Sequence, residues 1–249
     1  MKPNEFSYID GYLKSNLDIA KSAIKKDFDM VIGVDGVEGG GKSVMAMQAA
    51  HYCDPTLNME RIVFTPSEFR KAINKADKYQ AVVYDEAYTG LMSRNTMGVI
   101  NRALVSMLAE IRQKNLFVFV VMPTFFDLDR YVAIWRSRAL IHVYTAEGFE
   151  RGYFAFYNTD RKKDLYINGK KTYSYGLPRP NFIGRFTNNY ILDETEYRKK
   201  KLLSLTNREK QAEEKEIVDR VEAELFDRLM NLEIELSHTV KMNILANYA

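Results

Sequence analysis

The segment Gly36-Val-Glu-Gly-Gly-Gly-Lys-Ser43 constrains the fold of this chain more than any other feature. It fits the pattern G-x-x-x-x-G-K-[ST], in which glycines let backbone N–H groups turn toward phosphate oxygens. The apolar run Met30–Val34 before it predicts a buried strand, and Ser43–Tyr52 after it predicts a helix. A glycine-rich turn with a chance lysine would not need a strand and a helix on its two sides. The sequence therefore predicts a phosphate-binding loop.

The chemistry of this loop assigns roles to its residues. A helix that begins near Lys42 points the positive end of its dipole at a bound anion, and the Lys42 ammonium can reach β- and γ-phosphates. The Ser43 hydroxyl can bind Mg²⁺. We therefore expect a nucleoside triphosphate and Mg²⁺ as ligands. The predicted nucleotide-binding residues are Gly36, Val37, Glu38, Gly39, Gly40, Gly41, Lys42, Ser43 and Val44.

A second apolar run, Ala81–Tyr84, ends in Asp85 and Glu86 and resembles a Walker B element. Asp85, at the tip of a strand, can hold Mg²⁺ through water, and Glu86 can polarise a water for attack on the γ-phosphate. An apolar run that ends in two acids can also be a simple strand exit. Its position some forty residues after a full phosphate loop favours the catalytic interpretation.

Strands that alternate with helices predict an α/β fold with a parallel sheet covered on both faces. We expect an N-terminal helical segment over residues 1–27 and a core over residues 28–150. The expected core strands are 30–34, 61–64, 80–84, 116–122 and 139–144, and the expected helices are 43–52, 68–76 (with Ser67 as its cap) and 99–113.

The pattern changes after Glu147. Residues 152–157 and 165–173 are aromatic or alternating, and Asn168-Gly169 between them is typical of a hairpin turn, so residues 151–192 predict a small antiparallel β addition. From about residue 194 the chain reads as a helical tail, 193–249. Apolar residues recur at helical spacing in that tail, which packs on the chain's own core or on a partner.

An extra strand between the two motifs, together with a glutamate beside Asp85, resembles the additional-strand, catalytic-glutamate division of P-loop ATPases. We assign residues 61–64 as that strand. The resemblance covers about residues 28–145 and implies a RecA-like core. It is strongest to FtsK/HerA-type DNA translocases and to viral genome-packaging, terminase-like ATPases. The sequence lacks a guanine-specific N-K-x-D motif, which favours ATP.

The resemblance implies two further functional features. Thr124 follows the fourth expected strand, where this division carries a polar sensor of the γ-phosphate; a threonine that caps the next turn is the equal alternative. Members of the division also take an arginine from a neighbouring subunit, in a ring of five or six copies. Our candidates for that arginine are Arg94, Arg136 and Arg138.

Composition narrows the class of partner. The net charge of the 249 residues is only +3, but residues 151–210 hold 14 Lys and Arg against 6 Asp and Glu. These clusters suit contacts with the phosphate backbone of double-stranded DNA. A single cysteine excludes a disulfide within the chain. The cysteine and the three histidines do not have the spacing of zinc ligands. With no apolar stretch of membrane-spanning length, we expect a cytoplasmic protein, in the host cytoplasm if viral, and no membrane partner.

The expected function is an ATP-hydrolysing motor that translocates or packages double-stranded DNA, with a portal or another protein as a further partner. Residues after 150 show no acidic set for a metal-dependent nuclease, and expected β structure after the core argues against an AAA+ lid. Two alternatives remain open. One is an ATP-dependent switch, such as a helicase loader or a transposition regulator. The other is a phage assembly or secretion ATPase that acts on protein.

Overall fold

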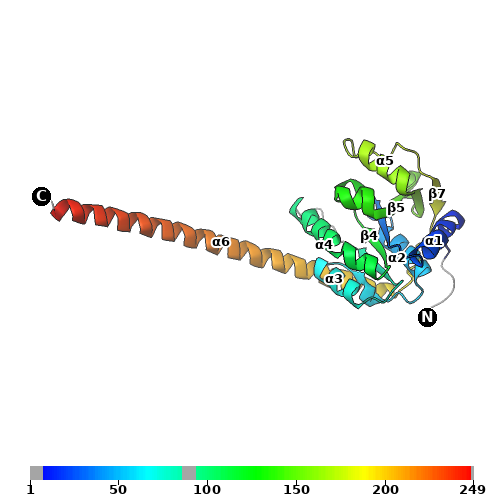
Figure 1. Ribbon diagram of the computed structural model, residues 1–249, viewed down its shortest axis with the longest axis horizontal. Helices are drawn as coiled ribbons and strands as arrows, with labels where there is room; N and C mark the ends of the chain where they lie inside the picture. The colour runs from blue at the N-terminus through cyan, green and yellow to red at the C-terminus, as the bar shows by residue number, and fades with distance from the viewer. Residues whose placement is uncertain (1–7, 86–93, 248–249) are drawn as a thin grey trace. The chain divides into compact units, whose positions relative to one another are not determined.

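A computed structural model describes residues 8–85 and 94–247. The fold of these residues is built on one sheet (Figure 1). This sheet has seven strands in the order β2-β3-β4-β1-β5-β6-β7. The strands are β1 (Met30–Gly36), β2 (Ile62–Val63), β3 (Ala81–Asp85), β4 (Phe117–Val121), β5 (Ser137–Tyr144), β6 (Tyr153–Tyr157) and β7 (Phe182–Arg185).

Strands β1 to β5 are parallel, whereas β6 and β7 add to the sheet in antiparallel pairing. The expected α/β class, the mostly parallel sheet and an antiparallel addition after the core are therefore confirmed. The long apolar runs of β3 and β4 are buried along their whole length, because helices cover both faces of a parallel sheet.

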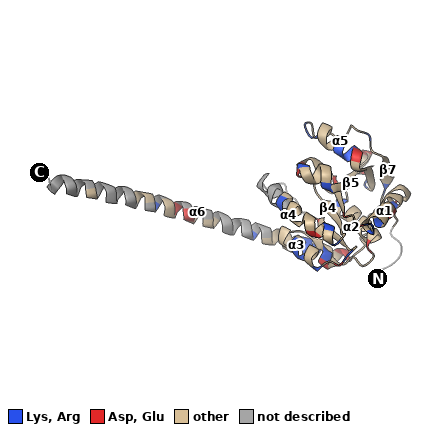
Figure 2. Cartoon of the chain, in the orientation of Figure 1, with Lys and Arg blue, Asp and Glu red and all other residues tan. Residues whose placement is uncertain are grey.

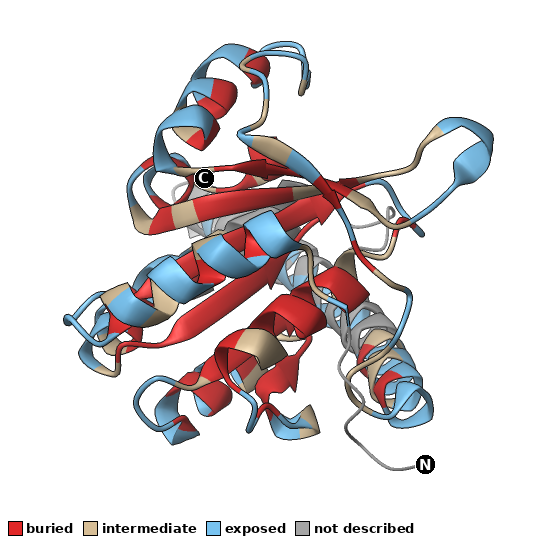
Figure 3. Cartoon of the chain, turned by 90° about the vertical axis from the view of Figure 1, so that its right-hand side faces the viewer, coloured by how far each residue is buried: buried red, intermediate tan, exposed pale blue. Residues whose placement is uncertain are grey.

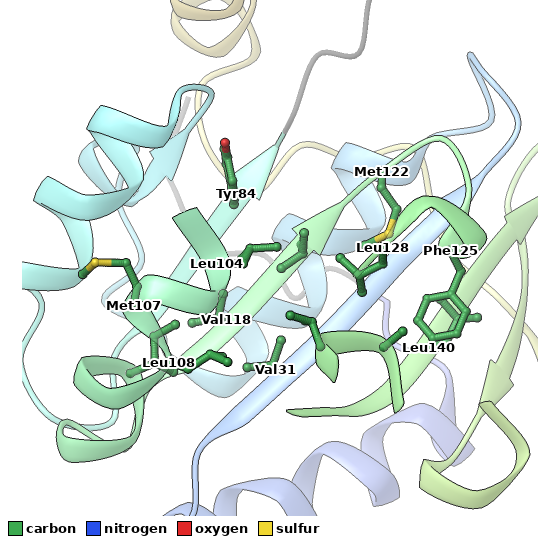
Figure 4. Packing of buried hydrophobic residues seen from close by; sticks show 14 of the residues in the cluster. Val31, Tyr84, Leu104, Met107, Leu108, Val118, Met122, Phe125, Leu128 and Leu140 are labelled. Carbon is green, nitrogen blue, oxygen red and sulfur yellow. The ribbon is translucent and has the colours of Figure 1, made fainter. Parts of the chain in front are cut away.

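Helices flank the sheet on its two faces. One hydrophobic cluster joins one face of the strands to α3, α4 and α5, and the other joins the opposite face to α1 and α2. Figure 3 shows the strands buried between helices whose outer sides are exposed, and Figure 4 shows the first cluster, with Leu104 and Leu108 of α4 packed near Val118 and Val31. The helices are α1 (Gly11–Ile24), α2 (Lys42–Cys53), α3 (Pro66–Lys75), α4 (Arg94–Gln113), α5 (Thr159–Gly169) and α6 (Glu194–Asn247).

Short helical turns connect the larger elements. They are η1 (Met59–Arg61), η2 (Phe125–Asp127), η3 (Val132–Arg136) and η4 (Glu147–Phe149). The cap of α3 differs from the expected Ser67. Thr65 caps the helix instead, because its hydroxyl accepts a bond from the Glu68 backbone N–H while the Glu68 carboxylate accepts one from the Thr65 backbone N–H.

The hairpin expected around Asn168-Gly169 is wrong. Residues 159–169 form the helix α5, which Asn158 caps by accepting a bond from the Arg161 backbone N–H. Its buried residues are Lys162, Leu165, Tyr166 and Gly169, which have the spacing of one helix face. The sequence pattern did not show this face, because a lysine is not expected among buried residues.

The structure also corrects which residues form the strand between the two motif strands. Residues 62–63 form β2, at the edge of the sheet beside β3. The strand that separates β1 from β3 is β4, which comes after Asp85 in the sequence. An inserted strand is therefore present, but it is residues 117–121 and not 61–64.

The chain divides into two units, residues 1–201 and residues 202–249. The first unit contains the sheet, the flanking helices and the first turns of α6, and the second consists of the remainder of α6. Among the described residues, no helix combines the length and the apolar character needed to cross a membrane.

Candidate functional site

The loop after β1 begins at a glycine that the fold requires. Gly36 has a φ of 131°, and a Cβ built on it would lie 1.8 Å from the Val143 carbonyl oxygen of β5. Any other residue would collide with the backbone of the neighbouring strand. The first glycine of the motif is therefore where the chain leaves the sheet in close contact with β5.

The loop ends at the amino end of α2. Gly41 precedes this helix with a left-handed φ of 100°, and no side chain caps it. The next backbone N–H groups therefore keep their capacity to bind an anion, and the helix dipole favours negative charge at the same place. Between the two ends, residues 37–39 are exposed to solvent.

Lys42 lies folded over the loop. Its Nζ donates to the carbonyl oxygens of Gly36 and Val37, each at 2.9 Å. Burial lowers the pKa of this ammonium, while the nearby carboxylates of Asp35, Glu38 and Asp85 oppose that effect. The predicted phosphate-binding lysine is thus held at the loop by weak neutral acceptors, for which a phosphate would be a stronger replacement.

Asp85 lies at the same edge of the sheet as this loop. Val121 of β4 is in register both with Val34 of β1 and with Asp85 of β3. Neighbouring strands are about 4.8 Å apart, so the end of β1 and Asp85 are about 10 Å apart across β4. The carboxylate of Asp85 is 2% exposed. The topology therefore brings together two motifs that are far apart in the sequence.

Tyr197, in the first turn of α6, lies against the predicted metal ligand Asp85. Its Oη donates to Asp85 Oδ2 at 2.5 Å, and the Ser43 side chain lies near enough to this hydroxyl to act on its pKa. Burial and the Asp85 charge both raise the pKa of Tyr197. The Lys201 ammonium lies 3.5 Å from Asp85 Oδ2 and 3.1 Å from the Tyr197 hydroxyl. The sequence did not predict that Tyr197 and Lys201 belong to this site, because nothing local in the sequence connects them to Asp85.

Ser43 and Asp85 fit the Mg²⁺ ion that the motifs imply. Asp85 accepts a hydrogen bond from the Tyr197 hydroxyl, and Ser43 lies near enough to that hydroxyl to act on its pKa, so both predicted ligands lie at one place in the fold. A serine hydroxyl and a carboxylate are hard oxygen donors, as Mg²⁺ prefers. The described part of the chain holds no cluster of three or more His, Cys, Asp or Glu that could bind a metal alone. The remaining ligands would come from phosphates and water.

Thr124 lies beyond the end of β4, as the sequence predicted, and β4 itself lies between the two motif strands. Its hydroxyl accepts a bond from the Phe126 backbone N–H at 3.3 Å and pairs with the Tyr175 hydroxyl at 3.0 Å. Thr124 therefore caps the turn η2, which is the alternative role expected for it. Its contact with a γ-phosphate stays a prediction.

A buried network that the sequence alone did not predict lies next to the loop. Asp35, fully buried, accepts bonds from the Tyr175 hydroxyl, from the Phe125 backbone N–H at 2.7 Å and from His142 Nδ1 at 2.9 Å. The His142 ring stacks on Tyr175 with their centroids 3.8 Å apart. A charged residue inside an apolar strand just before the motif was the available signal. The network ties the start of the loop to the Thr124 turn.

The arginine candidates have different surroundings. Arg136 donates to Asp29 Oδ2 at 2.5 Å, and its side chain is 15% exposed, so it serves as half of a largely buried ion pair in its own chain. We therefore remove it as a candidate for the transferred arginine. Arg138 lies 3.9 Å from Asp29 and is 34% exposed. Arg94 begins α4, but its side chain, like the whole of Glu86, lies outside the described residues.

The basic clusters are partly used inside the fold. Lys162 is fully buried and donates to the carbonyl oxygens of Ala133 and Ile134. Lys200 donates to the backbone carbonyl oxygens of Met59 and Ile62, and the following residue, Lys201, lies beside the Asp85 carboxylate. In Figure 2, basic and acidic positions are interspersed along α3 and α5. Fewer basic side chains are therefore free for DNA than the count implied.

No model of a protein family matches the sequence, and no curated protein matches it significantly. The functional conclusion therefore rests on the geometry of this site.

Proposed function

We propose that this chain is a P-loop nucleoside triphosphatase that hydrolyses ATP with Mg²⁺. The observation that carries the proposal is the convergence of Lys42, Ser43 and Asp85 at the carboxyl edge of the parallel sheet, beside the uncapped start of α2. In open α/β sheets, ligands bind at this edge. The inserted strand β4 between the two motif strands supports the additional-strand division and its RecA-like core.

The residues divide the chemistry between them. Backbone N–H groups from the loop and from the start of α2 bind the phosphates, and the Lys42 ammonium leaves the Gly36 and Val37 carbonyls for phosphate oxygens. Ser43 and Asp85 would hold Mg²⁺, which would neutralise charge on the β- and γ-phosphates. Glu86 follows Asp85 directly and accepts the proton of the attacking water. ATP is the proposed nucleotide because the sequence lacks N-K-x-D.

The narrower proposal is a ring-forming motor that moves double-stranded DNA. Its support is the resemblance of the two motifs to DNA translocases and the basic side chains that remain exposed, among them Lys170, Lys171 and Lys199. The nucleotide-dependent switch and the protein-directed assembly ATPase use the same site. Stimulation of ATP turnover by duplex DNA at low salt distinguishes the motor from both, because phosphate contacts weaken steeply with salt.

The test of the nucleotide site is the affinity for ATP of Lys42→Ala. Losing the ammonium should raise the dissociation constant by about a hundredfold, since a hydrogen bond to a charged group contributes about 1.5–3 kcal/mol. Lys71→Ala, an exposed lysine of α3, is the matched control and should bind as the wild type does. Equal affinity in Lys42→Ala and Lys71→Ala would contradict the proposal.

A further inference from the structure

The first turns of α6 bring a cation and a hydroxyl to the predicted metal ligand Asp85. The Lys201 ammonium lies 3.5 Å from Asp85 Oδ2, and the Tyr197 hydroxyl donates to the same oxygen at 2.5 Å. These contacts join residues more than 110 positions apart and lie wholly within the first unit. They are specific, because one carboxylate oxygen, Asp85 Oδ2, has two partners from the same helix.

This part of α6 is firmly attached around the contact. Tyr197 is 3% exposed, and its ring packs near Phe64 and Tyr190 with centroid distances of 5.8 Å and 5.5 Å. Lys200, one residue before Lys201, donates to the Met59 and Ile62 carbonyl oxygens at 2.9 Å and 2.6 Å. The position of Lys201 beside Asp85 is therefore set by the packing of the helix and not by a loose surface side chain.

The two cations cannot use the same oxygens at once. Mg²⁺ is bound in a near-ideal octahedron at about 2.0–2.1 Å from its oxygen ligands, and it keeps several waters that also need room. The Tyr197 hydroxyl lies 2.5 Å from Asp85 Oδ2, where such a shell would lie. An ammonium beside Mg²⁺ would add repulsion between like charges.

We propose that Lys201 is an internal cation that occupies the Asp85 carboxylate in place of Mg²⁺, and that Tyr197 closes the same site until Mg²⁺ and nucleotide displace both. The proposal rests on the proposed function, since it assigns new residues to that site. It makes the start of α6 the segment that moves when the nucleotide arrives with its metal. Nucleotide without Mg²⁺ leaves the two contacts in place.

The test compares affinities for a fluorescent, non-hydrolysable ATP analogue with Mg²⁺ and with a chelator. In Lys201→Met, the ratio of the chelator dissociation constant to the Mg²⁺ dissociation constant should rise about tenfold above the wild-type ratio, because Mg²⁺ no longer competes with an ammonium. Lys201→Arg keeps the positive charge and should keep the wild-type ratio. Lys199→Met, an exposed position on the same helix, is the matched control.

An unchanged or smaller ratio in Lys201→Met would overturn the proposal, because Lys201 would then act beside Mg²⁺ and not against it. If the wild type binds the analogue under neither condition, the proposed function fails and the inference with it. If the wild type binds but the ratios agree, only the inference fails.

Backbone hydrogen exchange gives a second readout that needs no variant. Amides of residues 195–201 should exchange faster when the wild type binds the analogue with Mg²⁺, since the hydroxyl and the ammonium leave Asp85. The analogue with chelator should leave their exchange as in the free protein. Slower exchange with Mg²⁺ would show that α6 closes on the nucleotide, which contradicts displacement.

Discussion

Asp35 connects several residues around the loop. Its buried carboxylate accepts three bonds, from Tyr175, Phe125 and His142. In Asp35→Asn, an amide group would replace one acceptor oxygen and face donors. We expect the free energy of unfolding in urea to fall by about 2 kcal/mol or more, the cost of leaving buried groups unsatisfied. Glu150→Gln, which removes one charge of an exposed pair with Arg185, should change stability little. Equal stability of the two variants would contradict this role.

Lys162 carries a pH dependence. Burial, with the nearby charges of Arg138 and Lys163, lowers its pKa from 10.5 to about 8 in the folded chain. Between these values the unfolded chain binds more protons than the folded chain, so stability rises with pH across that window. Below pH 8 both states are charged, and the burial penalty is fully present.

The measurement is urea unfolding of wild type and Lys162→Met from pH 7 to 10.5. The free energy of unfolding of the wild type, relative to that of the variant, should increase as the pH rises. The difference removes the titration of all other groups common to both proteins. A flat or falling difference would show that Lys162 is charged in the fold throughout this range.

At the scale of elements, α5 shows where local sequence signals mislead. Asn168-Gly169 is a strong turn signal, but tertiary packing decides the outcome: Leu165 and Tyr166 are buried together against the sheet and η2. In a helix, Asn168→Ala should leave stability unchanged or raise it by about 0.5 kcal/mol, because alanine is the better helix former. In a hairpin turn the same change would be destabilising. Thermal unfolding of this one variant therefore separates the two structures.

The loop and the strands could be predicted because each carries its own local pattern. The motif from Gly36 to Ser43 must lie between a strand and a helix, and the apolar runs of β1, β3 and β4 mark buried parallel strands. The order of strands in the sheet has no such local signal. The sequence therefore pointed to residues 61–64 as the inserted strand, whereas in the structure the inserted strand is β4. Tyr197 and Lys201 were missed for the same reason, since only the fold brings α6 to Asp85.

At the scale of the whole molecule, the resemblance implies a ring in which a neighbour supplies the arginine. With Arg136 bound to Asp29, the remaining candidates are Arg94 and Arg138. Turnover per chain should therefore rise with protein concentration. One of the two arginines, Arg94 or Arg138, should act in the site of the neighbouring subunit. When wild type is mixed with the alanine variant of that arginine, the rate should fall by more than the proportion of variant added. A linear loss with both variants, from a chain that stays monomeric with ATP, would contradict the ring.

We propose that this chain hydrolyses ATP at the site formed by the loop, Asp85 and Glu86. The most direct measurement is phosphate release from ATP with Mg²⁺ by wild type and Glu86→Gln, together with ATP binding by both. We predict that Glu86→Gln binds ATP with wild-type affinity and releases phosphate at least about a hundredfold more slowly, because the amide cannot accept the proton of the attacking water. Phosphate release by Glu86→Gln at the wild-type rate would contradict the account.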